Sequence, residues 1–177
     1  MKKHRLLSVL LITALVILTG TWGVKTILAP NDAAPVVNKM APDFDLPNLE
    51  GKQVNLKKTM AQNKVTLVNF WATWCPPCRG EIPELIDFNR KYSKQKVTVL
   101  AVNLQEEPKE VAAFAKEVGL NFPVLTDQTG KVGNLYQVYA IPTTFIIDRK
   151  GIIRFKIEGG TNLKTLAAKV EVLLKEK

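Results

Sequence analysis

Apolar runs alternate along this chain with segments whose apolar residues recur at helical spacing. Uninterrupted apolar runs rich in β-branched residues are typical of strands buried on both faces, and they predict strands at residues 65–72, 97–103 and 122–126. Helical spacing predicts helices at residues 79–92, 108–118, 132–136 and 163–174. A β-hairpin is predicted at residues 143–148 and 152–157. The alternation predicts an α/β fold, with helices on both faces of a sheet that ends in an antiparallel hairpin.

The first 39 residues differ from this pattern. Residues 6–24 carry no charge and follow a basic start at residues 1–5. An uncharged run of this length approaches the roughly 20 residues that a helix needs to cross a bilayer. It therefore predicts a transmembrane signal anchor with the basic start in the cytoplasm. A cleaved signal peptide and a buried core helix are the alternatives.

Residues 25–39 are predicted to be a linker, because Pro30 and Pro35 disfavour regular structure. The folded domain is expected at residues 40–177. Both the anchor and the cleaved signal export this domain. The expected location is the cell membrane, with a single pass and the domain on the extracytoplasmic side.

The charge distribution argues against one class of partner. The 177 residues carry a formal net charge of +9, and the first 25 contain four Lys and Arg residues but no acid. Farther along, both signs are interspersed, and no basic block is interleaved with aromatic residues, so nucleic acid is not an expected partner. A solvated basic surface is the plain interpretation, and mild attraction to anionic lipid head groups is the alternative.

The two cysteines, Cys75 and Cys78, allow three kinds of site. A zinc site needs four ligands, usually Cys and His, and the single histidine, His4, lies in the basic start. A structural disulfide gains most from closing a long loop, whereas this pair would close a very short one. A redox-active pair fits better, because the motif follows a predicted strand and opens a predicted helix. No metal and no cofactor are expected.

The redox interpretation assigns the two sulfurs different roles. A thiolate attacks a disulfide, and a second thiol resolves the mixed disulfide. A helix N-terminus stabilises negative charge, which favours the Cys75 thiolate as the attacking group. Cys78 lies one turn farther into the helix, so we expect it to be more shielded and to resolve the intermediate.

The segments Trp74–Cys78 (WCPPC) and Tyr139–Asp148 (YAIPTTFIID) resemble the thioredoxin superfamily over about residues 40–177. The resemblance implies that Pro142 forms a cis peptide bond and faces the cysteines. It also implies that the backbone of Ile141 pairs with the substrate chain. Trp74 is expected to be a hydrophobic lid, a substrate contact, or both.

Within that superfamily the chain resembles most the membrane-anchored TlpA/ResA-like branch. Residues 41–56 resemble its N-terminal β-hairpin, and residues 106–127 resemble its inserted helix–strand segment. Glu81, three residues after Cys78, matches a glutamate near that branch's active site. The implied architecture is a thioredoxin-like fold with a central mixed β-sheet flanked by helices.

Two interpretations of Glu81 remain open from the sequence. It is either an ordinary first-turn glutamate that favours the helix dipole, or a partly buried acid that exchanges protons with Cys78. Trp71 is expected to be a packing residue. Arg79 is expected to be a surface charge; the alternative is that it also lowers the affinity of Cys78 for its proton.

The family resemblance implies an extracytoplasmic thiol-disulfide oxidoreductase that reduces disulfides in exported proteins. Electrons would come from a membrane donor of the CcdA/DsbD type, and apocytochrome c would be a target, as in cytochrome c maturation. Pro76 and Pro77 supply neither charge nor N–H donors between the cysteines, which favours a reducing pair. A thiol-disulfide oxidase or isomerase is the alternative.

Two further classes fit the sequence less well. A peroxiredoxin-like thiol peroxidase needs a P-x-x-x-T-x-x-C pattern. Counting back from Cys75 gives Ala72 and Val68 at the two required positions, and counting back from Cys78 gives Cys75 and Trp71. A binding module or chaperone that merely keeps the fold is disfavoured, because both cysteines are present.

Overall fold

A computed structural model describes residues 35–176 of the 177-residue chain. The predicted basic start, the anchor at residues 6–24 and most of the linker lie outside the described residues. None of the helices within the described part is long and apolar enough to cross a membrane.

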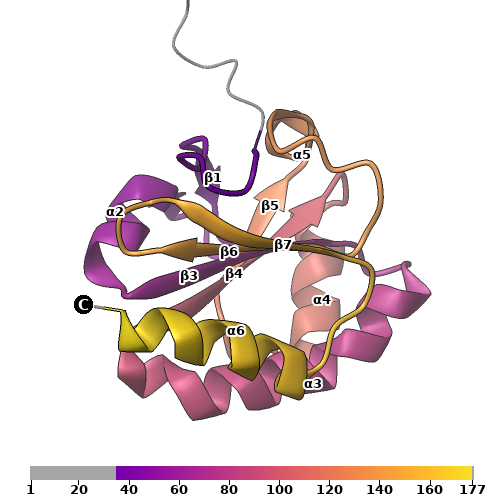
Figure 1. Ribbon diagram of the computed structural model, residues 1–177. Coiled ribbons are helices and arrows are strands. Elements are labelled where there is room, and N and C mark those ends of the chain that lie inside the picture. The colour runs from indigo at the N-terminus through magenta and orange to yellow at the C-terminus, as the bar shows by residue number, and fades with distance from the viewer. Residues whose placement is uncertain (1–34, 177) are drawn as a thin grey trace, which may run out of the picture. The chain divides into compact units, whose positions relative to one another are not determined.

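The centre of the fold is a five-stranded sheet with strand order β5-β4-β3-β6-β7 (Figure 1). Strands β3 and β4 are parallel, β4 and β5 are parallel, and β6 runs antiparallel to both β3 and β7. A separate two-stranded antiparallel sheet precedes it. The strands are β1 (Asp45–Pro47), β2 (Gln53–Asn55), β3 (Val65–Trp71), β4 (Val97–Leu104), β5 (Val124–Asp127), β6 (Thr143–Asp148) and β7 (Ile153–Glu158). The predicted mixed sheet and the N-terminal hairpin are both confirmed.

Helices cover both faces of this sheet. They are α2 (Leu56–Gln62), α3 (Pro76–Tyr92), α4 (Pro108–Val118), α5 (Lys131–Leu135) and α6 (Leu163–Lys175), with a 3-10 turn η1 (Ser93–Gln95). In Figure 1, α3 and α6 lie together on one side of the sheet. Helix α4 has the predicted bounds of residues 108–118: Pro108 begins it, and Gly119 follows its end in the left-handed conformation.

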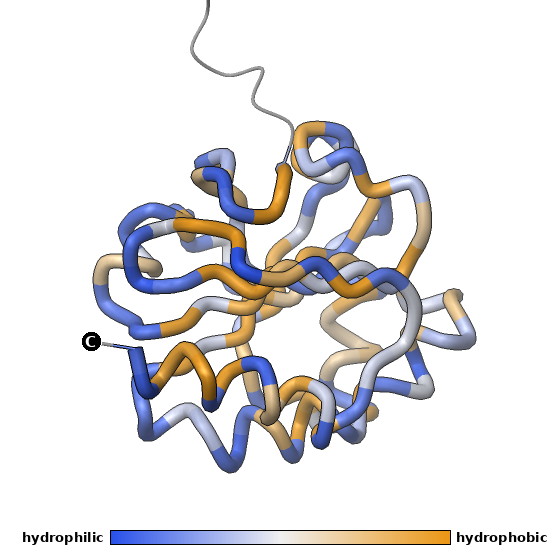
Figure 2. The backbone as a smooth tube through the Cα atoms, viewed as in Figure 1, coloured by the Kyte–Doolittle hydropathy of each residue, from blue (hydrophilic) through white to orange (hydrophobic). Residues whose placement is uncertain are grey.

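Alternation along β3 divides the core into two layers. Val65 and Leu67 point into one apolar cluster with α3, α4 and α6, whereas Val68 and Phe70 point into a second with α2 and α5. Because both faces are covered, every residue of the strand is buried, including the polar Thr66 and Asn69. Figure 2 shows hydrophobic positions concentrated along the inner elements.

The differences from the sequence prediction are local. Helix α2 was not predicted; Asn55 caps it by accepting a hydrogen bond from the Lys58 N–H at 2.8 Å. Strand β5 begins at Val124 rather than at residue 122, because Pro123 has no N–H to offer the ladder. Helix α3 continues through Pro83 to Tyr92.

Tyr136 provides a test of the second core layer. Its ring is fully buried, and its hydroxyl donates a hydrogen bond to the Pro42 carbonyl at 2.6 Å. We expect Tyr136→Phe to lower the free energy of unfolding by about 1–2 kcal/mol, since the Pro42 carbonyl loses its partner. The matched control is Tyr139→Phe, because Tyr139 is 91% exposed. Urea denaturation of both variants measures the effect, and equal midpoints would contradict it.

Candidate active site

The two cysteines lie where β3 passes into α3. Strand β3 ends at Trp71, and Cys75 is the N-cap residue of α3. Pro76 and Pro77 occupy the first positions of the helix, where the N–H that they lack has no intrahelical partner. Cys78 follows one turn into the helix, and the two sulfurs form a disulfide with the Cα atoms 5.3 Å apart.

Burial does not distinguish the two cysteines. Cys75 is 2% exposed and Cys78 is 1% exposed in this disulfide form, so the expected extra shielding of Cys78 is not seen here. Their backbone positions do distinguish them. The Cys78 N–H donates a hydrogen bond to the Cys75 sulfur at 3.2 Å, and this donor at a helix N-terminus favours negative charge on Cys75.

The loop before β6 lies against the Cys75 sulfur. The Ile141–Pro142 peptide bond is cis, as the family resemblance implies. The Ile141 carbonyl oxygen lies 3.8 Å from the Cys75 sulfur. The Pro142 carbonyl accepts a hydrogen bond from the Gly159 N–H at 2.8 Å, which ties this loop to the end of β7. Ile141 therefore presents backbone beside the reacting atom.

Trp74 and Tyr139 are the large exposed aromatic side chains near these two segments. Trp74, directly before Cys75, is 69% exposed, and Tyr139, two residues before Ile141, is 91% exposed. Trp74 therefore presents a large apolar surface to solvent directly before Cys75. Trp71 is 3% exposed and packs against Phe114 with ring centroids 5.6 Å apart, which confirms its predicted packing role.

Glu81 is buried beneath the cysteines. The sequence interpretation as a first-turn glutamate is wrong, because α3 begins at Pro76 and has no acid in its first turn. The side chain is 3% exposed. Burial raises the pKa of Glu81 above its ordinary value of 4.5, and hydrogen bonds from Asn69 and Thr161 partly oppose that rise.

The partners of Glu81 come from elements far apart in the sequence. The Asn69 amide in β3 donates to Glu81 Oε1 at 2.8 Å and to the Thr144 hydroxyl at 2.9 Å. The Thr161 N–H donates to Glu81 Oε2 at 3.0 Å. A small cavity of about 10 Å³ is lined by both Glu81 and Cys78. The acid thus shares a small cavity with Cys78.

Glu106 holds the loop that carries Trp74. Its carboxylate accepts hydrogen bonds from the Thr73 N–H at 2.7 Å, from the Thr73 hydroxyl, and from the Asn103 amide at 2.6 Å. The Arg79 guanidinium donates to the Thr73 carbonyl at 3.3 Å and lies over the Phe114 ring. Two neighbouring charged side chains therefore fix Thr73 from both sides.

Sequence reasoning missed Glu106 and Asn69 as parts of the site. Asn69 left one signal, since it is the polar residue inside the otherwise apolar end of β3. Glu106 left none, because it is one of several acids in a polar loop. Within residues 35–176, no three His, Cys, Asp or Glu side chains converge in a way that would hold a metal ion.

The comparisons with known proteins agree with this geometry. The AhpC/TSA family profile matches residues 37–156. The chain is 43% identical over 131 residues to the thiol-disulfide oxidoreductase ResA of Geobacillus thermodenitrificans, covering 74% of each chain. It is 37% identical to the thioredoxin-like protein YneN of Bacillus subtilis, covering 97% of this chain and 99% of YneN.

A solved structure is similar over the described domain. It is a thiol:disulfide interchange protein of the thioredoxin family from Chlorobium tepidum, with a TM-score of 0.70 and 27% identity, covering 80% of this chain and 99% of that one. This chain thus has a cysteine pair at a strand–helix junction, facing a cis-proline loop, and it is similar to proteins that are named for disulfide exchange. The chain belongs to the AhpC/TSA family of thioredoxin-like proteins and is a thiol-disulfide oxidoreductase of the ResA-like kind.

Proposed function

We propose that this chain reduces disulfides in exported proteins from the extracytoplasmic side of a membrane, to which residues 6–24 anchor it. The observation that carries the reducing direction is the environment of Cys75. Pro76 and Pro77 follow it, and the hydrogen bond that its sulfur accepts comes from the Cys78 N–H. A thiolate with modest stabilisation belongs to a reducing pair, because a strongly stabilised reduced form makes an oxidant.

The proposed reaction transfers two electrons to the substrate. The Cys75 thiolate attacks one sulfur of the substrate disulfide, whose S–S bond breaks and releases a substrate thiolate. Cys78 then attacks the Cys75 sulfur, which forms the Cys75–Cys78 disulfide and releases the second substrate thiolate. A membrane dithiol donor of the CcdA/DsbD type restores the reduced pair. Apocytochrome c, with its paired haem-binding cysteines, is the proposed target.

The substrate chain would lie along the exposed edge of the site. Ile141 offers backbone groups beside Cys75, and Trp74 offers a large exposed apolar surface on the adjoining loop. Main-chain pairing of this kind gives affinity without requiring one sequence. Glu81 is proposed to take the Cys78 proton as resolution begins, because burial raises the pKa of Glu81 and so makes its carboxylate a stronger base than an exposed one.

Trapping tests the order of the two cysteines. Incubated with apocytochrome c whose two cysteines are oxidised to a disulfide, the full-length Cys78→Ser variant is expected to accumulate a mixed disulfide through Cys75. The Cys75→Ser variant is the control and should accumulate none. The unchanged protein, reduced with a dithiol and freed of it beforehand, should release reduced apocytochrome c and end as the Cys75–Cys78 disulfide. Mass spectrometry under non-reducing conditions identifies the adduct. If insulin but not apocytochrome c is reduced, the proposed target is wrong while the reducing activity stands.

The reduction potential tests the direction of electron flow. We expect a value nearer that of thioredoxin, about −270 mV, than that of DsbA, about −120 mV. Pro77→His places a cation beside the Cys75 thiolate and should shift the potential toward oxidation by roughly 30 mV or more, whereas Pro77→Ala should shift it less. Equilibration in defined dithiol buffers, followed by thiol alkylation, measures each value. A value near that of DsbA in the unchanged protein would reverse the proposed direction.

Glu81→Gln tests the proton transfer. Removing the titrating group is expected to slow resolution of the mixed disulfide about 100-fold, the lower end of the range for acid–base catalysis. It should also remove one inflection from the pH profile of that step. Stopped-flow measurement of Trp74 fluorescence follows the reaction, with Glu110→Gln on the exposed face of α4 as control. An unchanged pH profile would leave Glu81 with a structural role only.

The raised pKa of Glu81 also predicts how the free energy of unfolding depends on pH. The pKa of Glu81 is raised in the folded chain, so the folded state holds a proton that the unfolded state releases. The extra proton on Glu81 stabilises the folded state fully below about pH 4.5, the pKa of the unfolded chain. This stabilisation is lost as the pH rises through the pKa of Glu81 in the folded chain. Between these two pKa values, we expect the free energy of unfolding of the unchanged protein to fall relative to that of Glu81→Gln. Urea denaturation of both proteins at a series of pH values measures the difference.

A further inference from the structure

The topology gathers one group of charged residues at the end of the sheet opposite the cysteines. Val65 at the start of β3 pairs with Val97 at the start of β4 and with Asp148 at the end of β6. These three strand ends therefore lie side by side. The cysteines follow the other end of β3, and Pro142 precedes the other end of β6.

The residues that flank these three strand ends are mostly cationic. The term basic pole is used here for seven exposed cations: Lys39, Lys64, Lys94, Lys96, Arg149, Lys150 and Lys175. Lys64 and Lys96 are joined through their backbones, since the Lys64 N–H donates to the Lys96 carbonyl at 2.7 Å. Lys64, Arg149, Lys150 and Lys175 line one shared surface depression of about 310 Å³. Within residues 35–176, none of the seven lies in an ion pair.

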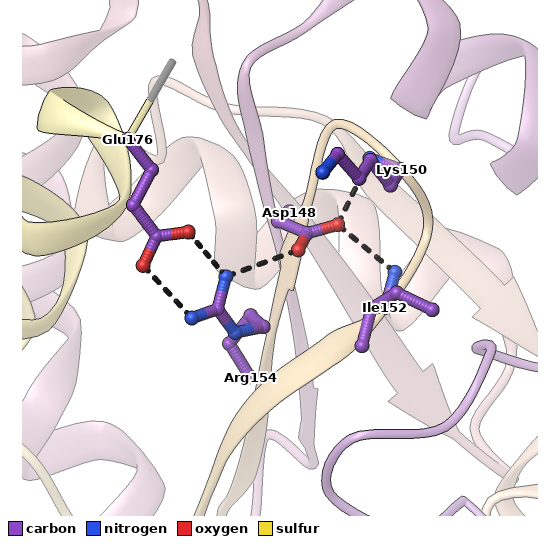
Figure 3. Close-up of polar contacts among 5 residues, drawn as sticks. All are labelled: Asp148, Lys150, Ile152, Arg154 and Glu176. Atoms are coloured by element: carbon purple, nitrogen blue, oxygen red, sulfur yellow. Dashed lines mark hydrogen bonds and ion pairs between the residues drawn. The ribbon is translucent and has the colours of Figure 1, made fainter.

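The acids at this end offset the basic pole only in small part, because Arg154 pairs with both of them. Asp148, Arg154 and Glu176 together leave one negative charge beside the seven cations. Figure 3 shows the Arg154 guanidinium between Asp148 and Glu176. It contacts Asp148 at 3.2 Å and both carboxylate oxygens of Glu176 at 2.6 and 2.8 Å. The remaining oxygen of Asp148 accepts the N–H groups of Lys150 and Ile152.

Exposed apolar residues adjoin these charges where the chain leaves its N-terminal segment. The Lys39 carbonyl accepts a hydrogen bond from the Ile153 N–H at 2.9 Å, which fixes this segment beside the start of β7. Met40 is 57% exposed, and its sulfur lies against Gly151 in the turn that holds Arg149 and Lys150. Val36 and Val37, just before it, are 51% and 39% exposed. Cations beside exposed apolar side chains suit the boundary between head groups and acyl chains.

We propose that the basic pole docks the domain on the anionic head groups of the membrane that holds the chain, and so turns the cysteines away from the bilayer. This inference rests on the proposed anchor at residues 6–24. The anchor keeps the domain within reach of the surface, and the basic pole selects which end faces it. Each cation near an anionic surface favours docking by roughly fivefold.

Chemical labelling of the full chain in vesicles tests the docking. The chain is reconstituted in vesicles of phosphatidylcholine alone, or of phosphatidylcholine with phosphatidylglycerol, and treated with a membrane-impermeant amine reagent. We expect Lys64, Lys96 and Lys150 to be labelled several-fold more slowly on the anionic vesicles. Lys109 and Lys131, exposed at the starts of α4 and α5 near the cysteine end, should be labelled equally on both. Added salt should abolish the protection, because it screens exposed charges.

A pair of matched variants separates the basic pole from overall charge. The double variant Lys64→Gln with Lys150→Gln removes two charges from the basic pole. It should lower the equilibrium constant for docking on the order of 25-fold, and the labelling rate of Lys96 measures this change. Lys109→Gln with Lys131→Gln removes two charges elsewhere and should leave Lys96 protected. Both double variants should reduce insulin normally in detergent, since none of these lysines lies at the cysteines.

The possible failures are distinguishable. Equal labelling on both vesicles, from a chain that floats with them, would overturn the docking and leave the anchor intact. A chain that does not float with either vesicle would overturn the anchor and the docking with it. Protection by inorganic phosphate on phosphatidylcholine vesicles would show a site for free anions and overturn the assignment to lipid.

Discussion

The first turn of α3 is the constraint on which the site depends. A helix begins with N–H groups that no carbonyl of its own can accept, and here the Cys75 sulfur accepts the one from Cys78. This contact makes a cysteine the cap of a helix, so the capping group is also the reacting group. Pro76 and Pro77 keep the turn helical while offering no further donors. The helix cap and the proposed reducing character therefore rest on the same few residues.

The sheet supplies the second half of the site through register. Phe70 near the end of β3 pairs with Thr143 at the start of β6, so the loops that follow β3 and precede β6 must meet. That is why Ile141 reaches the Cys75 sulfur although 66 residues separate them. The same pairing brings Thr144 to Asn69 and completes the polar contacts around Glu81. A buried acid is tolerated there because both its oxygens are hydrogen-bonded.

Most of the fold was predictable because its signals are local. Apolar runs, a proline at the start of α4 and Gly119 after its end were enough to place strands and helices. The cysteine pair was predictable for the same reason. The environment of Glu81 was not, because its burial depends on Thr161, 80 residues away. Helix α2 was missed because the short segment LKKTMAQ has only two buried residues, Leu56 and Met60, which is too little periodicity to mark a helix.

The parallel strands β3, β4 and β5 give this mixed sheet two unlike ends, and the chain uses them differently. Reacting groups gather where β3 ends, since helix N-termini and loops converge there. Lysines gather where β3 and β4 begin. The chain segments around those strand ends are the ends of α3 and α6 and the β6–β7 turn, and the lysines on them are exposed. Burial at one end suits chemistry that must exclude water, and full exposure at the other suits attraction to a charged surface. Because the whole sheet separates the two, charge at the basic pole can change without altering the thiolate of Cys75, whose nearest donor is the backbone N–H of Cys78.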